Sequence, residues 1–242
     1  MSNTVIHKSN TRGYKHLGWL ESYHTFSFAK YNNPERMNFG VLRVLNDDSV
    51  YLGQGFNNHP HANMEIVSIP LEGDLEHKDS MGNIAVIREG DIQVMSAGTG
   101  ITHSEYNKNK DRVVKFLQIW IIPNKENVTP RYDQISIRDF SQENKFFQIL
   151  SPSKEDQGVW IHQNAWFSLG YFSEGNSDEY QMNKAENGVY VFLIEGDAIV
   201  NGEQLLKRDG IGIWDVNSVK VEATADARVL LMEVPMKTIN IN

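Results

Sequence analysis

Short apolar segments separated by glycine, asparagine and acidic residues run through the whole chain. Those richest in β-branched and aromatic residues predict strands at 38–44, 66–71, 92–95, 113–122, 189–194 and 228–234. Turn residues recur between them, notably at Asn46-Asp47-Asp48 and Asn201-Gly202, and the second of these predicts a tight hairpin. No long stretch has the 3.6-residue period of a helix. The pattern predicts an all-β protein built as a sandwich or barrel.

A glycine turn recurs in the two halves of the chain. The sequence Leu-Glu-Gly-Asp around Gly73 returns as Ile-Glu-Gly-Asp around Gly196, about half a chain length further on. Such turns are common and can recur by coincidence. A polar, proline-containing stretch at 123–131 lies near the midpoint, where a boundary between two units is expected. Together these observations favour two stacked β-barrels of similar build.

Composition and charge narrow the possible functions. The 242 residues carry a net charge of −8 and no cysteine. Nucleic acids and anionic membranes bind clustered Lys and Arg, so neither is expected as a partner. Without thiolates, a metal would be held by histidine and carboxylate side chains. No apolar stretch approaches the roughly 20 residues of a membrane span, and residues 1–16 do not resemble a signal peptide, so we expect a cytoplasmic protein.

Two pairs of potential metal ligands share one spacing. His59 and His61 flank Pro60, and His103 and Glu105 flank a serine. In an extended strand, residues two positions apart project from the same face, so both members of a pair can reach one point. Pro60 has no N–H for a sheet ladder, which favours a strand start or an edge strand near a barrel mouth. The pairs predict three imidazoles and one carboxylate around a transition metal such as Fe, Mn, Ni, Cu or Zn.

Other interpretations of these residues stay open. An isolated histidine is usually a structural or surface residue, and this is the interpretation for the unpaired ones: His7, His16, His24, His77 and His162. Glu65 lies an even number of positions after His59 and His61, so in an extended strand it would project from the same face. It therefore competes with Glu105 for the position of the carboxylate ligand. Glu65 could instead orient a ligating imidazole from behind.

The surroundings of both pairs resemble the two cupin motifs. The first pair stands between Gly53 and Glu65, and the second stands between Gly100 and Asn107. Within the cupins, the chain is most similar to the pirin family. The blocks that carry this similarity are 18–28, 53–61, 79–83, 95–100, 103–107 and 129–132. The likeness covers about residues 12–132, whereas the second half matches only in its rhythm of strands and turns.

The resemblance implies a bicupin, in which two antiparallel, jelly-roll-like β-barrels pack face to face. It implies a metal-binding barrel at 1–132 and a second barrel at 133–242, which contains no His-x-His and therefore lacks the ligands. The family's metal ligands carry over onto His59, His61, His103 and Glu105. The implied cofactor is one divalent transition metal, iron first, with nickel, manganese, copper, cobalt or zinc as alternatives.

Some pirins resemble quercetin 2,3-dioxygenases, which implies an oxidoreductase that opens flavonols with release of carbon monoxide. The expected partners are therefore a small aromatic substrate and dioxygen. Glu105 would act as the catalytic base and take the proton of the substrate's 3-hydroxyl. A flat substrate needs an apolar pocket. Candidates for its lining, each of which is more often a core residue, are Phe26, Phe28, Phe56, Met64 and Trp120.

Two other functions are consistent with the same residues. A non-enzymatic metal-binding regulator would bind protein partners according to the oxidation state of its metal, although the chain shows no Lys/Arg cluster for nuclear import. A different cupin reaction, such as isomerisation or decarboxylation of a small acid, would use the same ligands. Oxygen uptake coupled to substrate conversion distinguishes a dioxygenase from both.

Overall fold

Strands in four sheets make up nearly all the regular structure. The computed structural model describes residues 3–237, in which helical structure is limited to three 3-10 turns: η1 (Ser9–Thr11), η2 (Pro34–Arg36) and η3 (Arg138–Phe140). No helical segment in this described part has the length and apolar character that a bilayer crossing requires. The predicted all-β class is confirmed.

The first half of the chain forms one large and one small sheet. In spatial order, the large sheet contains β12 (Arg131–Ser136), β9 (Asp91–Ser96), β6 (Glu65–Glu72), β11 (Val114–Ile121), β4 (Leu42–Val50), β3 (Leu20–His24) and β2 (Gly13–His16). The small sheet contains β5 (Gly55–His61), β10 (Ile101–Asn107), β7 (Leu75–Asp79) and β8 (Ile84–Ile87).

The second half repeats this plan. Its large sheet contains β1 (Asn3–His7), β20 (Gly210–Trp214), β17 (Asn187–Glu195), β22 (Ala227–Pro235), β15 (Trp166–Phe172), β13 (Phe146–Ser151) and β14 (Val159–Trp160). Its small sheet contains β16 (Ser177–Gln181), β21 (Ser218–Ala223), β18 (Ala198–Val200) and β19 (Glu203–Leu205). Neighbouring strands in the four sheets are antiparallel, apart from the parallel pair β13 and β14.

The internal repeat is visible in the strand order. The turns at Gly73 and Gly196 follow β6 and β17, which occupy the same place in their sheets, and both glycines have positive φ, 75° and 77°. At one edge, β1 takes the place in the second sheet that β12 takes in the first. The boundary predicted after residue 132 falls inside β12, which pairs with β9 of the first barrel. We propose instead that each barrel consists of one large and one small sheet, so that all of β12 belongs to the first barrel and β1, which pairs with β20, belongs to the second.

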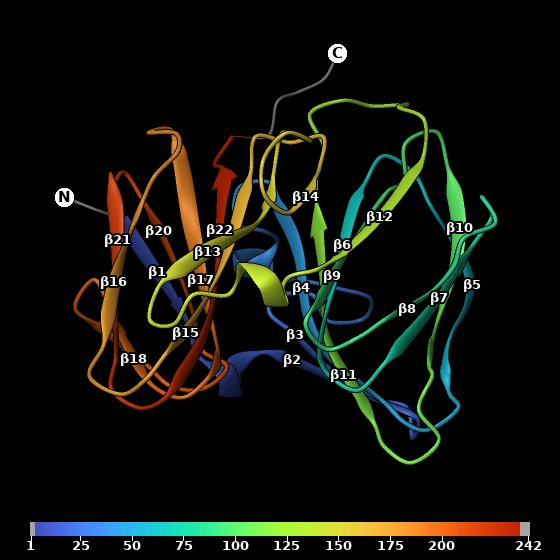
Figure 1. Cartoon of the computed structure of the whole chain (residues 1–242), viewed down its shortest axis with the longest axis horizontal. Helices are drawn as coiled ribbons and strands as arrows, with labels where there is room; N and C mark the ends of the chain where they lie inside the picture. Colours follow the sequence, from blue (N-terminus) through green and yellow to red (C-terminus); the bar gives the residue numbers. More distant parts are fainter. Residues whose placement is uncertain (1–2, 238–242) are drawn as a thin grey trace.

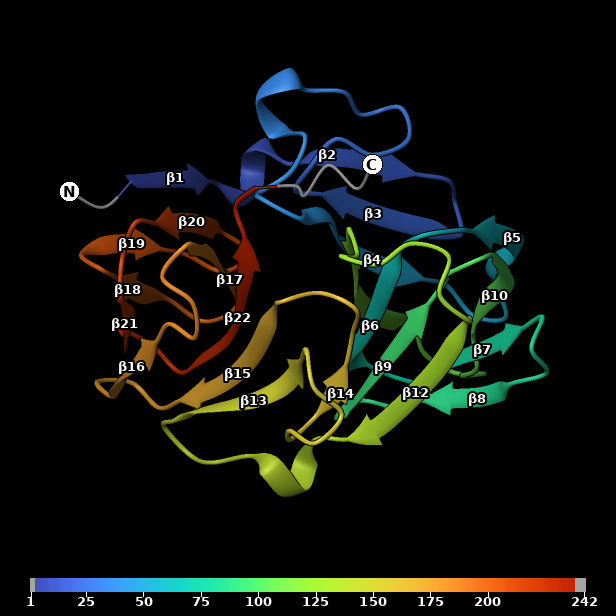
Figure 2. The same cartoon turned by 90° about the horizontal axis from the view of Figure 1, so that it is seen from above.

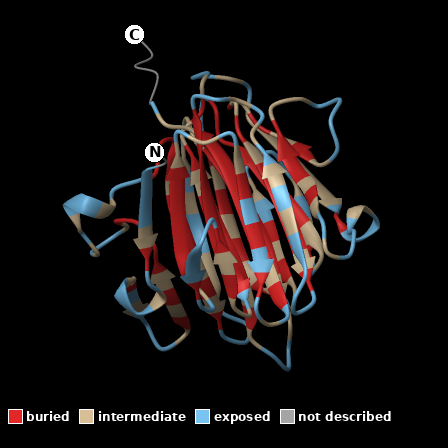
Figure 3. Ribbon diagram, turned by 90° about the vertical axis from the view of Figure 1, so that its left-hand side faces the viewer, coloured by how far each residue is buried: buried red, intermediate tan, exposed pale blue. Residues whose placement is uncertain are grey.

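The two large sheets face each other in the middle of the molecule, and the small sheets lie at its two ends (Figures 1 and 2). Buried residues from both large sheets form one hydrophobic cluster between them. Central strands such as β11 are therefore buried on both faces: Leu117 and Ile119 join this cluster, while Gln118 lines a cavity of the first barrel. Buried positions run along the strands, and many exposed positions lie in the connecting loops (Figure 3). The predicted bicupin packing is confirmed.

The interiors of the two barrels differ in chemistry. The second barrel is filled by one cluster of buried, almost entirely aliphatic residues that includes Val189, Val191 and Leu231. The first barrel holds two smaller apolar clusters, centred on Phe116 and on Met95. Buried histidine, glutamate, glutamine and asparagine side chains occupy other positions of its strands. Buried polar groups need partners, which a bound ligand can supply. The first barrel, which contains such groups, is therefore better suited to hold a ligand than the apolar second barrel.

Most predicted strands and the predicted hairpin are confirmed, and one turn is wrong. Asn201 and Gly202 connect β18 to β19 with positive φ values of 46° and 90°, as a tight hairpin turn requires. The stretch Asn46-Asp47-Asp48, by contrast, lies in the middle of β4, which begins at Leu42 rather than at residue 38. Two of these polar residues have side-chain partners from distant parts of the sequence: Asp47 pairs with Arg12 and Arg208, and Asp48 accepts from Ser22.

Candidate metal centre

Three imidazoles meet inside the first barrel. His59 and His61 lie on β5, and His103 lies on the neighbouring β10, directly opposite His59. One ring nitrogen of each lies within 4.8 Å of the others. The ring centroids are 4.4 to 5.0 Å apart. The spacing of the two pairs therefore correctly predicted that these histidines converge.

A register shift on β5 helps to aim the first pair. His103 faces His59, whereas Glu105, two residues later, faces Phe56, so β5 carries one extra residue in this interval. Such a bulge locally twists a strand and redirects its side chains. The carbonyl of Asn57, inside the bulge, accepts a hydrogen bond from His59 Nδ1 at 2.7 Å. β5 is also an edge strand of its sheet, as Pro60 predicted.

The unsatisfied ring nitrogens fit a bound cation. His61 Nε2 and His103 Nε2 are buried and have no hydrogen-bond partner within the described residues. His59 Nδ1 is hydrogen-bonded to the carbonyl oxygen of Asn57, which leaves His59 Nε2 available as a metal ligand. Burial, followed by the neighbouring imidazoles, lowers the pKa of His61 to about 4 and that of His103 to about 2. Neutral imidazole is the metal-binding form, so the donor set fits a divalent transition metal.

Glu105 lies beside this cluster. It is buried, lines the same cavity as His59 and His61, and receives hydrogen bonds from Ser68 Oγ at 3.2 Å and from Gln118 Nε2 at 3.0 Å. Burial raises the pKa of Glu105 to about 7, against the lowering effect of these hydrogen bonds. A carboxyl group whose pKa lies near 7 is suited to proton transfer at neutral pH. Its role as the fourth metal ligand stays a prediction, because the 4.8 Å group contains only the three imidazoles.

His77 and Asp79 support His103 from behind. His103 Nδ1 lies 3.4 Å from His77 Nδ1, and His77 Nε2 lies 3.1 Å from Asp79 Oδ2. Since the carboxylate accepts, His77 carries its proton on Nε2, and its Nδ1 accepts the proton of His103 Nδ1. This chain of hydrogen bonds leaves the lone pair of His103 on Nε2, the buried ring nitrogen that has no partner among residues 3–237. Such partners fix the orientation and tautomer of metal-binding histidines.

Replacing His77 by phenylalanine should therefore weaken metal binding by roughly 10- to 100-fold, the usual cost of removing a supporting partner. The variant leaves His103 Nδ1 without an acceptor while keeping an aromatic ring against Tyr132, whose ring centroid is 4.8 Å from that of His77. Competition with a chelator measures the affinity for Ni²⁺. His16→Phe, at an exposed histidine, is the matched control. Equal affinities of wild type and His77→Phe would rule out this supporting role.

Glu65 has a different environment from Glu105. It is buried on β6, where Ser96 Oγ donates to its Oε2 at 2.7 Å. Within residues 3–237, none of the three clustered imidazoles is hydrogen-bonded to it. The contacts therefore give no support to Glu65 as the group that orients a ligating imidazole. His77 and the Asn57 carbonyl make those contacts instead.

Burial raises the pKa of Glu65 from 4.5 to about 7, a rise that the Ser96 hydrogen bond and the charge of Arg131 only partly oppose. The folded state thus binds this proton more tightly than the unfolded chain, so folding stability falls as pH rises from about 4.5 to about 7. Glu65→Gln should be about as stable as wild type at pH 4.5 and more stable at pH 8, by roughly 1–3 kcal/mol. Denaturant unfolding at both pH values, with both proteins in the same metal state, measures this. A wild-type-like pH dependence in the variant would contradict it.

A cavity of about 290 Å³ opens beside His59, His61 and Glu105. Three of the five candidates, Phe28, Phe56 and Trp120, line it, although the sequence favoured a core position for each. The other two lie elsewhere: Phe26 belongs to the cluster between the large sheets, and Met64 packs against the smaller cluster around Met95. The cavity also has polar walls, which the sequence did not predict.

Comparison with known proteins places the chain in a family. The profile of the family described as Pirin matches residues 6–121, and that of the Quercetinase C-terminal cupin domain matches residues 148–234. A protein of Escherichia coli K12 named quercetin 2,3-dioxygenase is 41% identical over 230 residues, which cover 95% of this chain and 98% of that protein. A pirin-like protein of Caulobacter vibrioides is 36% identical over 217 residues, 89% of this chain and 93% of the relative. The chain belongs to the pirin family.

A solved pirin structure agrees with this placement. The bacterial pirin YhhW of Escherichia coli, in complex with nickel(II), has a TM-score of 0.91 and 39% identity, covering 96% of this chain and 99% of that one. The nickel complex of this relative and the three-histidine cluster together support a divalent metal in the pirin described here. Dioxygenases are oxidoreductases, so the prediction of an enzyme of that class is confirmed by the names of the relatives.

Two histidines that matter for this pirin were missed in the sequence. His77 contacts His103, and His24 lines the cavity, although both were interpreted as structural or surface residues. A signal was present for His77, because His77 and Asp79 repeat the two-residue spacing of the ligand pairs. His24 and Ser22 share that spacing too, on β3. Neither pair could be linked to the metal cluster without the strand pairing.

Proposed function

We propose that this pirin is a metal-dependent dioxygenase that opens flavonols such as quercetin and releases carbon monoxide. The observation that carries the proposal is the set of unpartnered imidazole nitrogens on His61 and His103, placed beside a cavity that also contains Glu105. The relatives named quercetin 2,3-dioxygenase support this choice of reaction. We propose His59, His61, His103 and Glu105 as the metal ligands.

The aromatic residues of the cavity suit a flat substrate. Phe28 and Trp120 meet edge to face at 5.4 Å, and Trp120 meets His61 in the same way at 5.0 Å. These rings form an apolar surface that excludes water and holds an aromatic ligand beside the imidazoles. Phe56 contributes a second apolar surface, held by Trp19 at 5.3 Å.

Glu105 is the base in this proposal. Its carboxylate accepts the proton of the substrate's 3-hydroxyl, because the group is buried and lines the cavity beside His59 and His61. Ser68 and Gln118 hold the carboxylate in one orientation through their hydrogen bonds. The divalent metal, when bound, supplies a Lewis acid that favours the substrate anion and its reaction with dioxygen.

The second barrel plays a structural part in this proposal. Its interior is apolar, and Met182, at the position that corresponds to His59 in the internal repeat, packs against that apolar cluster. We propose iron as the native metal, with nickel, manganese, copper, cobalt and zinc as alternatives, since histidine and carboxylate donors accept all of them.

Oxygen uptake with quercetin tests the proposed reaction. Protein loaded separately with each of the six metals is mixed with quercetin, and consumption of dioxygen, loss of quercetin and release of carbon monoxide are followed together. The proposal expects all three to occur in equal amounts with at least one metal, and none with metal-stripped protein. Quercetin left unchanged with all six metals would overturn it, and conversion without oxygen uptake would favour another cupin reaction.

A further inference from the structure

A row of polar side chains crosses the inner face of the first large sheet. His24 on β3 lies opposite Asn46 on β4, Asn46 lies opposite Gln118 on β11, and Gln118 lies opposite Ser68 on β6. Residues that are directly opposite on antiparallel neighbours point to the same face of a sheet. We call these four residues the polar row. All four are buried.

The two ends of the polar row differ in their partners. Ser68 and Gln118 donate to Glu105, so that end belongs to the site already described. At the other end, His24 Nδ1 and Asn46 Oδ1 are buried and have no partner among residues 3–237. His24 is only 4% exposed and Asn46 only 2%, and both line the cavity. Buried polar atoms without partners are unfavourable, which makes this end a place for a ligand.

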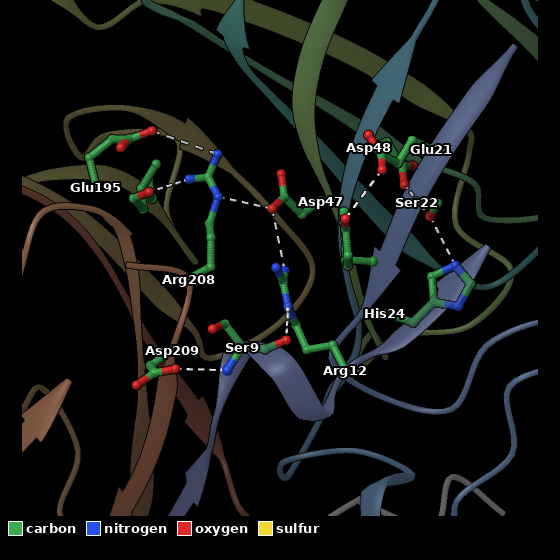
Figure 4. Close-up of polar contacts among 12 residues, drawn as sticks. Ser9, Arg12, Glu21, Ser22, His24, Asp47, Asp48, Glu195, Arg208 and Asp209 are labelled. Atoms are coloured by element: carbon green, nitrogen blue, oxygen red, sulfur yellow. Dashed lines mark hydrogen bonds and ion pairs between the residues drawn. The ribbon is translucent and has the colours of Figure 1, made fainter. Parts of the chain in front are cut away.

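Both unpartnered atoms are hydrogen-bond acceptors. With Asp48 ionised, Ser22 donates its hydroxyl proton to Asp48 Oδ1, and Ser22 Oγ accepts from His24 Nε2, 2.9 Å away (Figure 4). His24 therefore carries its proton on Nε2 and a lone pair on Nδ1. Burial, with the charges of Arg12 and Lys15, lowers the pKa of His24 to about 4, so the ring is neutral at pH 7. Asn46 Oδ1 is a carbonyl acceptor next to it.

The distance from the metal cluster suits the far end of a multi-ring molecule. Neighbouring strands are about 4.8 Å apart, so His24 lies roughly two strand spacings from Gln118, which holds Glu105. An aromatic surface spans the same interval: Trp120 meets His61 at 5.0 Å, Phe28 meets Trp120 at 5.4 Å, and His24 meets Phe28 at 5.2 Å. The cavity therefore has a polar wall and an aromatic wall that both lead from the imidazoles to His24.

We propose that His24 and Asn46 form a hydroxyl-recognition subsite that accepts hydrogen bonds from a second O–H group of the substrate. This inference rests on the proposed function, because the first hydroxyl is the one held beside the metal and Glu105. It assigns the substrate class as polyhydroxylated aromatic compounds, in preference to aromatic compounds with a single hydroxyl. Ser22 and Asp48 are positioning residues, since they fix the tautomer of His24 and do not need to touch the ligand.

A pair of flavonols that differ in their distal hydroxyls tests the subsite. Quercetin and 3-hydroxyflavone share the 3-hydroxyl, but 3-hydroxyflavone has no other O–H group. Their dissociation constants are measured anaerobically on metal-loaded protein, where no turnover occurs. Wild type should bind quercetin at least about 10-fold more tightly, the effect of one or two added hydrogen bonds. In His24→Phe and in Asn46→Leu, the ratio of the two constants should fall at least 3-fold towards unity.

Thr25→Val is the matched control, because Thr25 Oγ1 is also buried without a partner but does not line the cavity. It should keep the wild-type ratio. Because each ratio compares two ligands on one protein preparation, a general loss of stability does not change it, and the wild-type preference needs no variant at all. A wild type without preference, or a preference that survives both variants, overturns the subsite alone. Failure of both flavonols to bind wild type overturns the proposed function as well.

Discussion

Replacing His103 by alanine should abolish metal retention at neutral pH and reduce quercetin turnover by more than 100-fold. The loss should exceed the roughly 10- to 100-fold typical of a supporting partner, because His103 is proposed to bind the metal itself. Its position allows little compensation: its ring lies between those of His59 and His77, with centroids 4.4 and 5.2 Å away. Elemental analysis after dialysis measures retention, and oxygen uptake measures turnover.

Ser104→Ala is the control for this experiment. Ser104 lies on β10 between His103 and Glu105, so its side chain points to the opposite face of the strand. This variant should keep wild-type metal content and turnover. His103→Ala protein that is folded, as judged by its circular dichroism, and still holds one metal per chain would show that the cation is bound elsewhere.

Replacing Glu105 by glutamine should lower kcat by about 10²- to 10⁴-fold while leaving metal bound, since general-base catalysis typically contributes that much. Glutamine keeps the shape of the side chain, and its single oxygen in the place of Oε1 can still accept from Ser68 and Gln118, but it cannot take up the substrate proton. The three imidazoles remain to hold the metal. Measured kcat, normalised to metal content, separates the loss of the base from loss of the cation.

Glu65→Gln provides the matched carboxylate control. Glu65 is equally buried in the same barrel, and burial raises its pKa to about 7 as well, but Ser96 is its side-chain partner. Its turnover per metal should stay within about 3-fold of wild type, because it lacks contact with the imidazole cluster. A Glu105→Gln enzyme as fast as wild type would contradict the proposed base.

The convergence of the ligands could be predicted because its signal is local. His59 and His61 share a face of one strand through the two-residue period, and His103 and Glu105 do so on another. The same local logic predicted Asn201-Gly202, where the turn conformation depends on the two residues themselves. That the two segments lie on neighbouring strands was an assumption of the prediction, and the pairing of β5 with β10 confirms it.

Residues whose roles depend on distant partners were not predictable in this way. Asn46, Asp47 and Asp48 have turn-forming composition, yet all three lie within β4. Asp47 points away from the cavity and pairs with Arg12 and Arg208, which come from the chain's beginning and from the second barrel (Figure 4). These long-range contacts override the local preference for a turn. Such conflicts between local and global structure are expected at functional sites, and Asn46 and Asp48 line the cavity.

The choice between two carboxylates shows the same limit. Glu65 and Glu105 are both buried glutamates on strands of the first barrel. Each lies an even number of positions from a histidine of the cluster, so the sequence allowed either one as the carboxylate ligand. Contacts from β11 separate them, because Gln118 reaches Glu105 and not Glu65. The sequence gives no local signal of that contact, since the two residues are thirteen positions apart in the chain and a strand reversal lies between them.

X-ray absorption spectroscopy on metal-loaded protein shows which side chains bind the cation. We expect three imidazole nitrogens and one carboxylate oxygen bound to the metal, with one imidazole signal missing in His103→Ala protein reloaded at high metal concentration. A spectrum with fewer than three imidazoles in the wild type, or one unchanged by the substitution, would show that the cluster of His59, His61 and His103 is not where this pirin holds its metal.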